Sequence, residues 1–158
     1  IYERFLAELK HKFEAVRVGD PLNPDTMMGA QVSKSQMERI LGYVDIAKQE
    51  GAEVLIGGGR LTGANYDAGF FIQPTILVGV RNDMRVAYEE IFGPVLCVIP
   101  FKDEAEVIAM ANDSEYGLAG AVWTQDINRA LRVARAVETG RMWVNTYHEI
   151  PAHAPFGG

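Results

Sequence analysis

Apolar residues recur at helical spacing in the first part of the chain. In residues 1–16 they stand three or four positions apart, which predicts an amphipathic helix. A second apolar stripe runs over residues 37–47, behind Ser33 and Gln36, which are spaced like the pair of an N-terminal capping box. Gly51 follows as the expected helix stop. The pattern therefore predicts two helices in this part of the chain.

Short runs of apolar and β-branched residues alternate with helical patterns along the rest of the chain. The predicted strands are residues 52–56, 70–78, 95–101, 119–124 and 142–145, and the predicted helices are residues 84–90, 103–112 and 126–139. Asp83 and Asp103 are the expected N-caps of the first two of these helices. Strands and helices that alternate with short connections are typical of crossover units. We therefore expect an α/β fold with a largely parallel sheet, flanking helices, and strands buried on both faces.

The composition restricts the class of protein. A chain of 158 residues forms one domain or a large part of one. The net charge of −6, with 15 scattered Lys and Arg residues, argues against a nucleic-acid partner, because phosphate binding needs clustered basic residues. No apolar run reaches the length of a membrane span, and the start lacks the order of a signal peptide. We therefore expect a cytoplasmic protein with no membrane partner.

Several residues that could carry chemistry are better explained by structure. Cys97, the single cysteine, lies within an apolar run, so we expect a core residue with an unreactive thiol. The glycines at positions 57–59 fit neither phosphate-binding glycine motif and predict a turn. The three histidines are too far apart to propose a metal site, and we expect none.

Two segments leave a functional and a structural interpretation open. Glu90 follows Glu89 on a short helix, where its carboxylate could accept two hydrogen bonds from a ribose diol while Phe92 stacks on a flat ring. A solvated helix face beside a core phenylalanine is the commoner origin of such a pattern. Residues 145–153 follow the last predicted strand, at the edge where ligands of parallel sheets gather. From their composition alone, a binding loop and an ordinary surface loop are about equally good explanations.

Five segments, in the same order, resemble the aldehyde dehydrogenase family over essentially the whole chain. They are EEIFGPV at 89–95, NDSEYGLA at 112–119, GRMWVN at 140–145, FFIQPT at 70–75 and PFGG at 155–158. Five family-like segments in one order are far more specific than any one of them. In addition, TYHEIPAHAPFGG at 146–158 resembles bacterial acetaldehyde and short-chain aldehyde dehydrogenases. The resemblance implies that residues 1–158 are part of the family's catalytic domain, in a truncated form.

The resemblance also implies three residues that bind the cofactor, NAD or NADP. Glu90 matches the glutamate that hydrogen-bonds the nicotinamide ribose, and Phe92 matches the phenylalanine that positions the nicotinamide. Gln49 matches a residue near the adenosine or its ribose. For Glu90 and Phe92, the resemblance reverses the preference for a purely structural interpretation.

Three further residues are implied to contact a small-molecule aldehyde. Phe156 matches an aromatic wall of the aldehyde tunnel. His148 and Ile150 fall where members of the family vary their substrate-entrance residues. The resemblance also implies that the intact parent enzyme is a homodimer or a homotetramer.

The family's catalytic cysteine, general-base glutamate, oxyanion asparagine, Rossmann cofactor domain and C-terminal tail have no match in these residues. We therefore expect no catalytic residue here and an isolated chain that is inactive. For the intact parent the resemblance implies that a cysteine thiolate attacks the aldehyde, hydride passes to NAD(P), and water hydrolyses the resulting thioester.

Two alternatives stay open at this stage. One is a family member that acylates coenzyme A or phosphorylates its product, which loss of the base glutamate upstream of Ile1 would favour. The other is a non-catalytic binding or assembly module, which an upstream cysteine and glutamate at family spacing would exclude.

Overall fold

The helices form where an apolar stripe follows a capping side chain. α2 (Lys34–Gln49) begins at Ser33, whose Oγ accepts a hydrogen bond from the Gln36 amide at 3.1 Å. It ends before Gly51, which has a positive φ of 97°. α1 (Tyr2–Glu14) confirms the first predicted helix, although none of its residues is buried. No helix of the chain has the length and apolar content needed to cross a bilayer.

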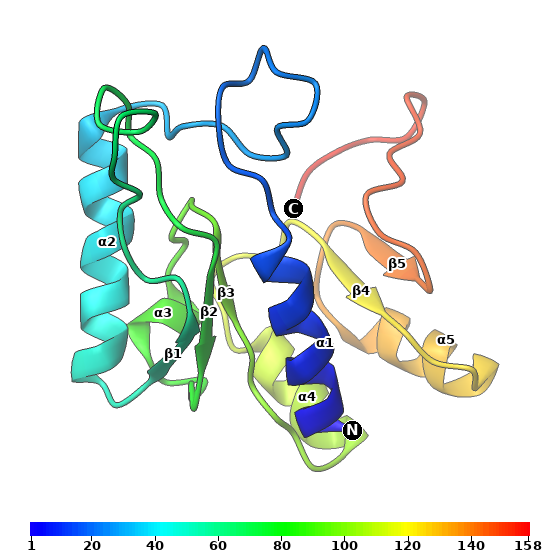
Figure 1. The fold of residues 1–158 in the computed structure, drawn as a ribbon. Helices are drawn as coiled ribbons and strands as arrows, with labels where there is room; N and C mark the ends of the chain where they lie inside the picture. Colours follow the sequence, from blue (N-terminus) through cyan, green and yellow to red (C-terminus); the bar gives the residue numbers. More distant parts are fainter. The chain divides into compact units, whose positions relative to one another are not determined.

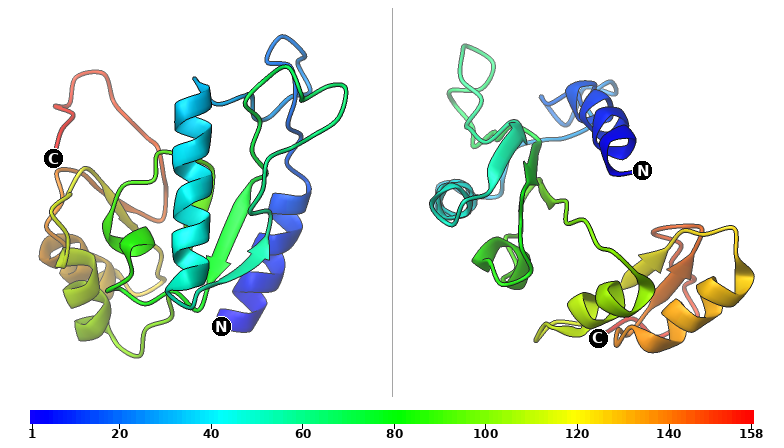
Figure 2. Two further views of the ribbon diagram at one scale, coloured as in Figure 1. Left: turned by 90° about the vertical axis from the view of Figure 1, so that its left-hand side faces the viewer. Right: turned by 90° about the horizontal axis from the view of Figure 1, so that it is seen from below.

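The computed structural model describes residues 1–158, which fall into two units, residues 1–100 and residues 101–158. Besides α1 and α2, the first unit contains β1 (Glu53–Ile56), β2 (Thr75–Val78), α3 (Arg85–Tyr88) and β3 (Val95–Cys97). Its sheet has the order β1-β2-β3, with β1 antiparallel and β3 parallel to β2 (Figure 1). In this unit α2 and α3 lie on one face of the sheet and α1 lies on the other (Figure 2).

The core of the first unit lies between α2 and the sheet. The buried face of α2 consists of Met37, Ile40, Tyr43, Val44 and Ala47. The same apolar cluster includes Leu77 of β2, Val86 of α3 and Ile91. Burying such a side chain contributes roughly 1.5–3 kcal/mol. This packing fixes α2 relative to the segment that follows α3, where the candidate cofactor residues lie.

The glycines at positions 57–59 form a tight turn beside β2, as the sequence predicts. Gly57 and Gly58 have positive φ values of 78° and 86°. The Gly58 amide donates to Thr75 Oγ1 at 2.8 Å, and this hydroxyl donates to the Gln73 carbonyl at 2.8 Å. A Cβ on Gly57 would collide with the Pro74 carbonyl. The turn therefore requires glycine for close packing of the backbone.

The second unit contains α4 (Glu104–Asn112), β4 (Gly120–Val122), α5 (Ile127–Ala136) and β5 (Met142–Val144). β4 and β5 form a parallel pair, joined through α5, which contacts both strands. Asp103 caps α4 and Asp126 caps α5, because each carboxylate accepts hydrogen bonds from backbone amides at the start of the helix. Arg132 of α5 donates two hydrogen bonds to the Glu104 carboxylate, at 2.8 and 2.9 Å, which tie the two helices together.

The α/β fold class is confirmed, but the predicted strand arrangement is wrong in part. The five strands form two sheets, and β3 pairs with β2 rather than continuing into one parallel sheet with β4 and β5. β3 ends at Cys97 instead of residue 101. Its Leu96 is 40% exposed, so this strand is not buried on both faces. β3 also stands at the edge of its sheet, where one side of its backbone has no neighbouring strand.

The predicted cap of α3 is also wrong. Met84 occupies the N-cap position of α3, and no side chain caps the helix from there. Asp83 instead accepts a hydrogen bond from Arg81 Nε at 3.1 Å. The Arg85 amide is satisfied by Glu50 Oε2 at 3.0 Å, from the end of α2. A residue distant in the sequence therefore supplies the cap.

Candidate functional site

Glu90 and Phe92 lie on the exposed side of the segment that follows α3. Between them Ile91 is 8% exposed and packs in the core, whereas Phe92 is 73% exposed and Glu90 is exposed as well. Exposed and buried positions therefore alternate, so that the Glu90 carboxylate and the Phe92 ring face solvent while the Ile91 side chain between them is anchored in the core. Phe92 has a φ of 55°, a left-handed conformation that is unfavourable for a bulky residue. The surrounding contacts must therefore hold this backbone in place.

Those contacts come from α2, which runs antiparallel to residues 85–92. They pair Glu50 with Arg85, Tyr43 with Glu89, Arg39 with Glu90 and Gln36 with Phe92. Gln36 Nε2 donates to the Phe92 carbonyl at 2.8 Å, and Arg39 Nη2 donates to the Glu90 carbonyl at 3.0 Å. Gln36 and Arg39 thus bind the backbone of this segment and form no hydrogen bond with the Glu90 carboxylate.

The two neighbouring glutamates differ in their surroundings. Glu89 accepts hydrogen bonds from Arg85 Nε at 2.7 Å, Arg85 Nη2 at 2.9 Å and the Tyr43 hydroxyl at 2.7 Å. The Arg85 guanidinium, followed by the Tyr43 hydroxyl, lowers the pKa of the Glu89 carboxyl to about 2. Arg39 and Arg85 both lie over the Tyr43 ring, at 5.6 and 5.8 Å from its centroid. Glu89 is thus held by its neighbours, whereas the Glu90 carboxylate forms no hydrogen bond or ion pair within the protein and can accept hydrogen bonds from a ligand.

A groove of about 530 Å³ runs along this segment. Its lining includes Glu90, Phe92, Val86, Val95 and Cys97. The lining combines apolar side chains with a carboxylate, and this combination suits a flat ring attached to a sugar.

Cys97 does not have the properties of a nucleophile, as the sequence predicts. Its thiol is half-buried and donates to the Val86 carbonyl, with 3.3 Å between sulfur and oxygen. Burial raises the pKa of the Cys97 thiol to about 11, so the thiolate is scarce at neutral pH.

Gln49 lies apart from the other two predicted cofactor residues. It is exposed at the C-terminal end of α2, whereas Gln36 near the other end contacts Phe92. Gln49 lies 13 positions after Gln36 in the helix, which corresponds to about 20 Å along the axis. Gln49 therefore does not join Glu90 and Phe92 in one cluster, and its role near the adenosine stays a prediction.

In the second unit, β5 leads into a loop with two strained residues. Asn145 and His148 have φ values of 54° and 67°. The Asn145 side chain forms hydrogen bonds with both backbone groups of Thr124. Its Oδ1 accepts from the Thr124 amide at 2.9 Å, and its Nδ2 donates to the Thr124 carbonyl at 2.9 Å. These two hydrogen bonds fix the start of the loop to the segment that follows β4.

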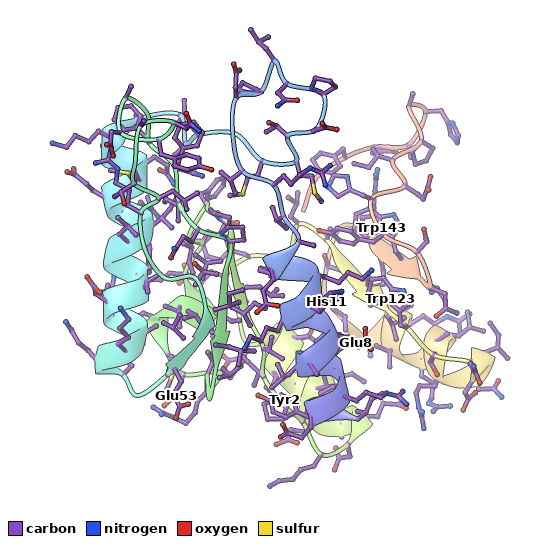
Figure 3. All side chains as sticks on the ribbon, in the orientation of Figure 1. Tyr2, Glu8, His11, Glu53, Trp123 and Trp143 are labelled. Carbon is purple, nitrogen blue, oxygen red and sulfur yellow. The ribbon has the colours of Figure 1, made fainter.

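An aromatic cluster surrounds the buried Trp143 of β5. His148 stacks on the Trp143 ring, with centroids 6.5 Å apart and an angle of 9° between the planes. Tyr147 meets Trp143 edge to face, with centroids 5.3 Å apart. Trp123, which follows β4, has its ring centroid 6.5 Å from that of Tyr147. Trp123 and Trp143 are labelled in Figure 3. The predicted entrance residue His148 thus belongs to a packed cluster.

The other two predicted substrate residues lie on the same loop. Ile150 is half-exposed, and Phe156 is 59% exposed. The Arg141 guanidinium lies over the Phe156 ring at 5.2 Å and over the Trp143 ring at 5.9 Å. The structure thus connects Phe156 and His148 through Arg141 and Trp143.

Sequence reasoning did not single out Gln36, Arg39 or Arg141 as residues that arrange the candidate sites. Gln36 was interpreted only as half of a capping pair. The position of Arg141 could have indicated its role, because a charged residue directly before a buried strand needs an interaction partner for its charge. That partner is a set of rings and a carbonyl contributed by residues further along the chain.

Comparison with known proteins gives matches over the full chain. The family model described as aldehyde dehydrogenase family matches residues 1–158. An acetaldehyde dehydrogenase from Pseudomonas aeruginosa is 56% identical over 100% of the chain and 31% of its own length. An aldehyde dehydrogenase from Deinococcus radiodurans is 51% identical over 100% of the chain and 30% of its own length.

Solved structures agree with these matches. Betaine aldehyde dehydrogenase from Staphylococcus aureus in its apo form superimposes with a TM-score of 0.97, at 40% identity, over 100% of the chain and 32% of its own. The same enzyme in complex with NAD+ gives a TM-score of 0.95, at 39% identity, over 98% of the chain and 31% of its own. The chain spans about a third of the length of each of these relatives.

Proposed function

Since the chain belongs to the aldehyde dehydrogenase family, we propose that it forms part of an enzyme that oxidises a small aldehyde to the corresponding acid with NAD. In this proposal the first unit supplies the Glu90 carboxylate and the Phe92 ring to the cofactor. The second unit supplies Phe156, His148 and Ile150 to the aldehyde. The cofactor, when bound, supplies the hydride acceptor.

The observation that carries the proposal is the contrast between Glu89 and Glu90. Glu89 is held by Arg85 and Tyr43, whereas the Glu90 carboxylate makes no hydrogen bond or ion pair. Exposed on an anchored backbone, it is ready to accept two hydrogen bonds from the vicinal hydroxyls of a ribose. Pre-organisation of this kind lowers the entropy cost of binding.

Phe92 complements this carboxylate. Its ring is exposed, although its backbone is held by Gln36 in a conformation that costs free energy. A strained and exposed aromatic residue beside a carboxylate is consistent with a ring that positions the nicotinamide. NAD is the cofactor we favour, because the matching Staphylococcus aureus enzyme forms a complex with NAD+.

A short, uncharged aldehyde is the proposed substrate. The Pseudomonas aeruginosa relative at 56% identity is an acetaldehyde dehydrogenase. The Trp143, Tyr147 and His148 rings pack against one another in the loop that would receive the aldehyde. The nucleophile is proposed to come from outside residues 1–158, because the Cys97 thiol is half-buried with a pKa of about 11. The isolated chain should accordingly be inactive, and the cytoplasmic location and homo-oligomeric state stay predictions.

The test uses the full-length enzyme that contains this chain. We expect NADH formation from acetaldehyde, and we expect Glu90→Gln to slow hydride transfer about tenfold, because a hydrogen bond to a charged acceptor is lost. Glu53→Gln, at an exposed glutamate of β1, is the matched control and should leave the rate unchanged (Figure 3). Equal single-turnover rates for wild type and Glu90→Gln would contradict the role of Glu90.

A further inference from the structure

Arg141 occupies an unusual position directly before β5. Its guanidinium lies over two aromatic rings, Trp143 and Phe156, and Nη2 donates to the Pro155 carbonyl at 2.9 Å. Nη1 is buried and has no hydrogen-bond acceptor. No carboxylate forms an ion pair with Arg141. The positive charge is therefore balanced mainly by the faces of the two rings and by one carbonyl dipole.

This side chain closes a loop that is held at several points. Asn145 fixes its start to Thr124, and Trp143 Nε1 donates to the Glu149 carbonyl at 2.8 Å in its middle. Arg141 fixes its end through Pro155 and Phe156. Without Arg141, the Pro155 carbonyl and the Phe156 ring lose the one polar side chain that holds them to β5.

We propose that Arg141 is a positioning residue that sets the Phe156 ring in the aldehyde entrance and makes the entrance selective for uncharged aldehydes. This inference rests on the proposed function, in which Phe156 contacts the aldehyde. It adds a positioning residue that the proposed function does not contain, and it gives a physical cause for the preference for an uncharged aldehyde.

The selectivity follows from which faces of the rings are occupied. Exposed Trp and Phe faces attract quaternary ammonium groups, which is how proteins commonly recognise such cations. Here the guanidinium of Arg141 already lies over Trp143 and Phe156. A cationic aldehyde that approached these rings would be repelled by the guanidinium, which no carboxylate neutralises, whereas uncharged acetaldehyde would not be repelled.

Arginine suits this position better than lysine. Its planar guanidinium can stack on two rings and donate to a carbonyl at the same time, whereas an ammonium group is a point charge with a stronger hydration shell. Arg141→Lys should therefore keep the charge but lose part of the positioning. Arg141→Met keeps the length of the side chain but removes the charge and the donor.

The test compares these variants in the full-length enzyme. The first readout is hydrogen exchange, followed by mass spectrometry, of the peptide that contains residues 145–156. We expect faster exchange in Arg141→Met, an intermediate effect in Arg141→Lys and none in Arg135→Gln, which alters an exposed arginine of α5. Wild-type exchange in both Arg141 variants would overturn the inference whether or not the enzyme is active.

The second readout is the ratio of kcat/KM for acetaldehyde to kcat/KM for betaine aldehyde, a cationic aldehyde. We expect this ratio to fall about tenfold or more in Arg141→Met and to fall less in Arg141→Lys, with KM for NAD unchanged in both. An unchanged ratio in Arg141→Met would overturn the selectivity. If the wild-type enzyme does not oxidise aldehydes, but Arg141→Met still speeds hydrogen exchange in residues 145–156, the result would count against the proposed function and not against the positioning role of Arg141.

Discussion

Gln36 donates a side-chain hydrogen bond to the carbonyl of Phe92, 56 residues further along the chain, at 2.8 Å. The same amide also reaches the Ile91 carbonyl, at 3.4 Å. The sequence predicts a reciprocal capping box for Ser33 and Gln36, but only half of it forms, because the Gln36 side chain is used for this tertiary contact. One glutamine thus links the start of α2 to the strained backbone of the candidate cofactor residue.

Replacing Gln36 should affect both stability and cofactor binding. Gln36→Met keeps the size of the side chain but removes the donor, so we expect a loss of about 1 kcal/mol in unfolding free energy. KM for NAD should rise, because Phe92 loses its anchor. Gln125→Met, at an exposed position, is the control. Denaturant unfolding and steady-state kinetics of the full-length enzyme would measure both effects, and an unchanged KM for NAD would argue against the anchoring role.

The positive φ of Phe92 predicts that two substitutions differ in their effect on stability. Phe92→Gly removes an exposed ring and relieves the backbone, so the unfolding free energy should stay within about 1 kcal/mol of wild type. Phe92→Val places a β-branched residue at the same φ and should destabilise by roughly 1–3 kcal/mol. Both variants should bind NAD more weakly, which titration of the full-length enzyme would show. Equal stability of the two variants would contradict the strained conformation.

The low pKa of Glu89 predicts a dependence of stability on pH. The folded-state pKa of about 2 lies below the ordinary value of 4.5, so the stabilisation is complete above about pH 4.5 and is lost as the pH falls toward 2. Glu89→Gln should lower the thermal midpoint at neutral pH and should reduce its further decrease between about pH 5 and about pH 3. Glu53→Gln should retain the wild-type dependence. Parallel curves for Glu89→Gln and wild type would contradict the ionic role of Glu89.

Cys97 should react slowly with alkylating agents. With a pKa of about 11, about one thiol in a thousand is ionised at pH 8, and the rate should rise with pH up to about 11. Mass spectrometry of the Cys97 peptide after a short exposure to iodoacetamide would measure this in the full-length enzyme. Cys97→Ala should retain NAD-dependent activity. Rapid alkylation of Cys97 at neutral pH, or loss of activity in Cys97→Ala, would show that this thiol has a chemical role.

Local patterns were sufficient to predict most of the elements. The apolar stripes of α2 and α5, the caps at Ser33 and Asp103, and the glycine turn at residues 57–59 depend on interactions between near neighbours in the chain. These interactions are visible in the spacing of residue types. The order of the family-like segments then pointed to the family, which the match over residues 1–158 confirms.

Strand pairing depended on the tertiary structure. An apolar run such as residues 95–101 predicts a strand but does not specify its neighbour, because the hydrogen-bonding groups of the backbone are the same at every residue. β3 pairs with β2 and is left at the edge of the sheet with Leu96 exposed. No periodicity within the strand encodes this pairing.

The sequence by itself determined the identity of the helices, the turn and the residues available for chemistry, because each follows from a side chain and its near neighbours. Only the tertiary structure decided that Glu89 is held by Arg85 and Tyr43 while Glu90 remains exposed, and that the Arg141 guanidinium lies over the rings of Trp143 and Phe156. Two adjacent glutamates look alike in a sequence. They differ in the molecule because the direction of each side chain is set by the packing of Ile91 and Val86 against α2.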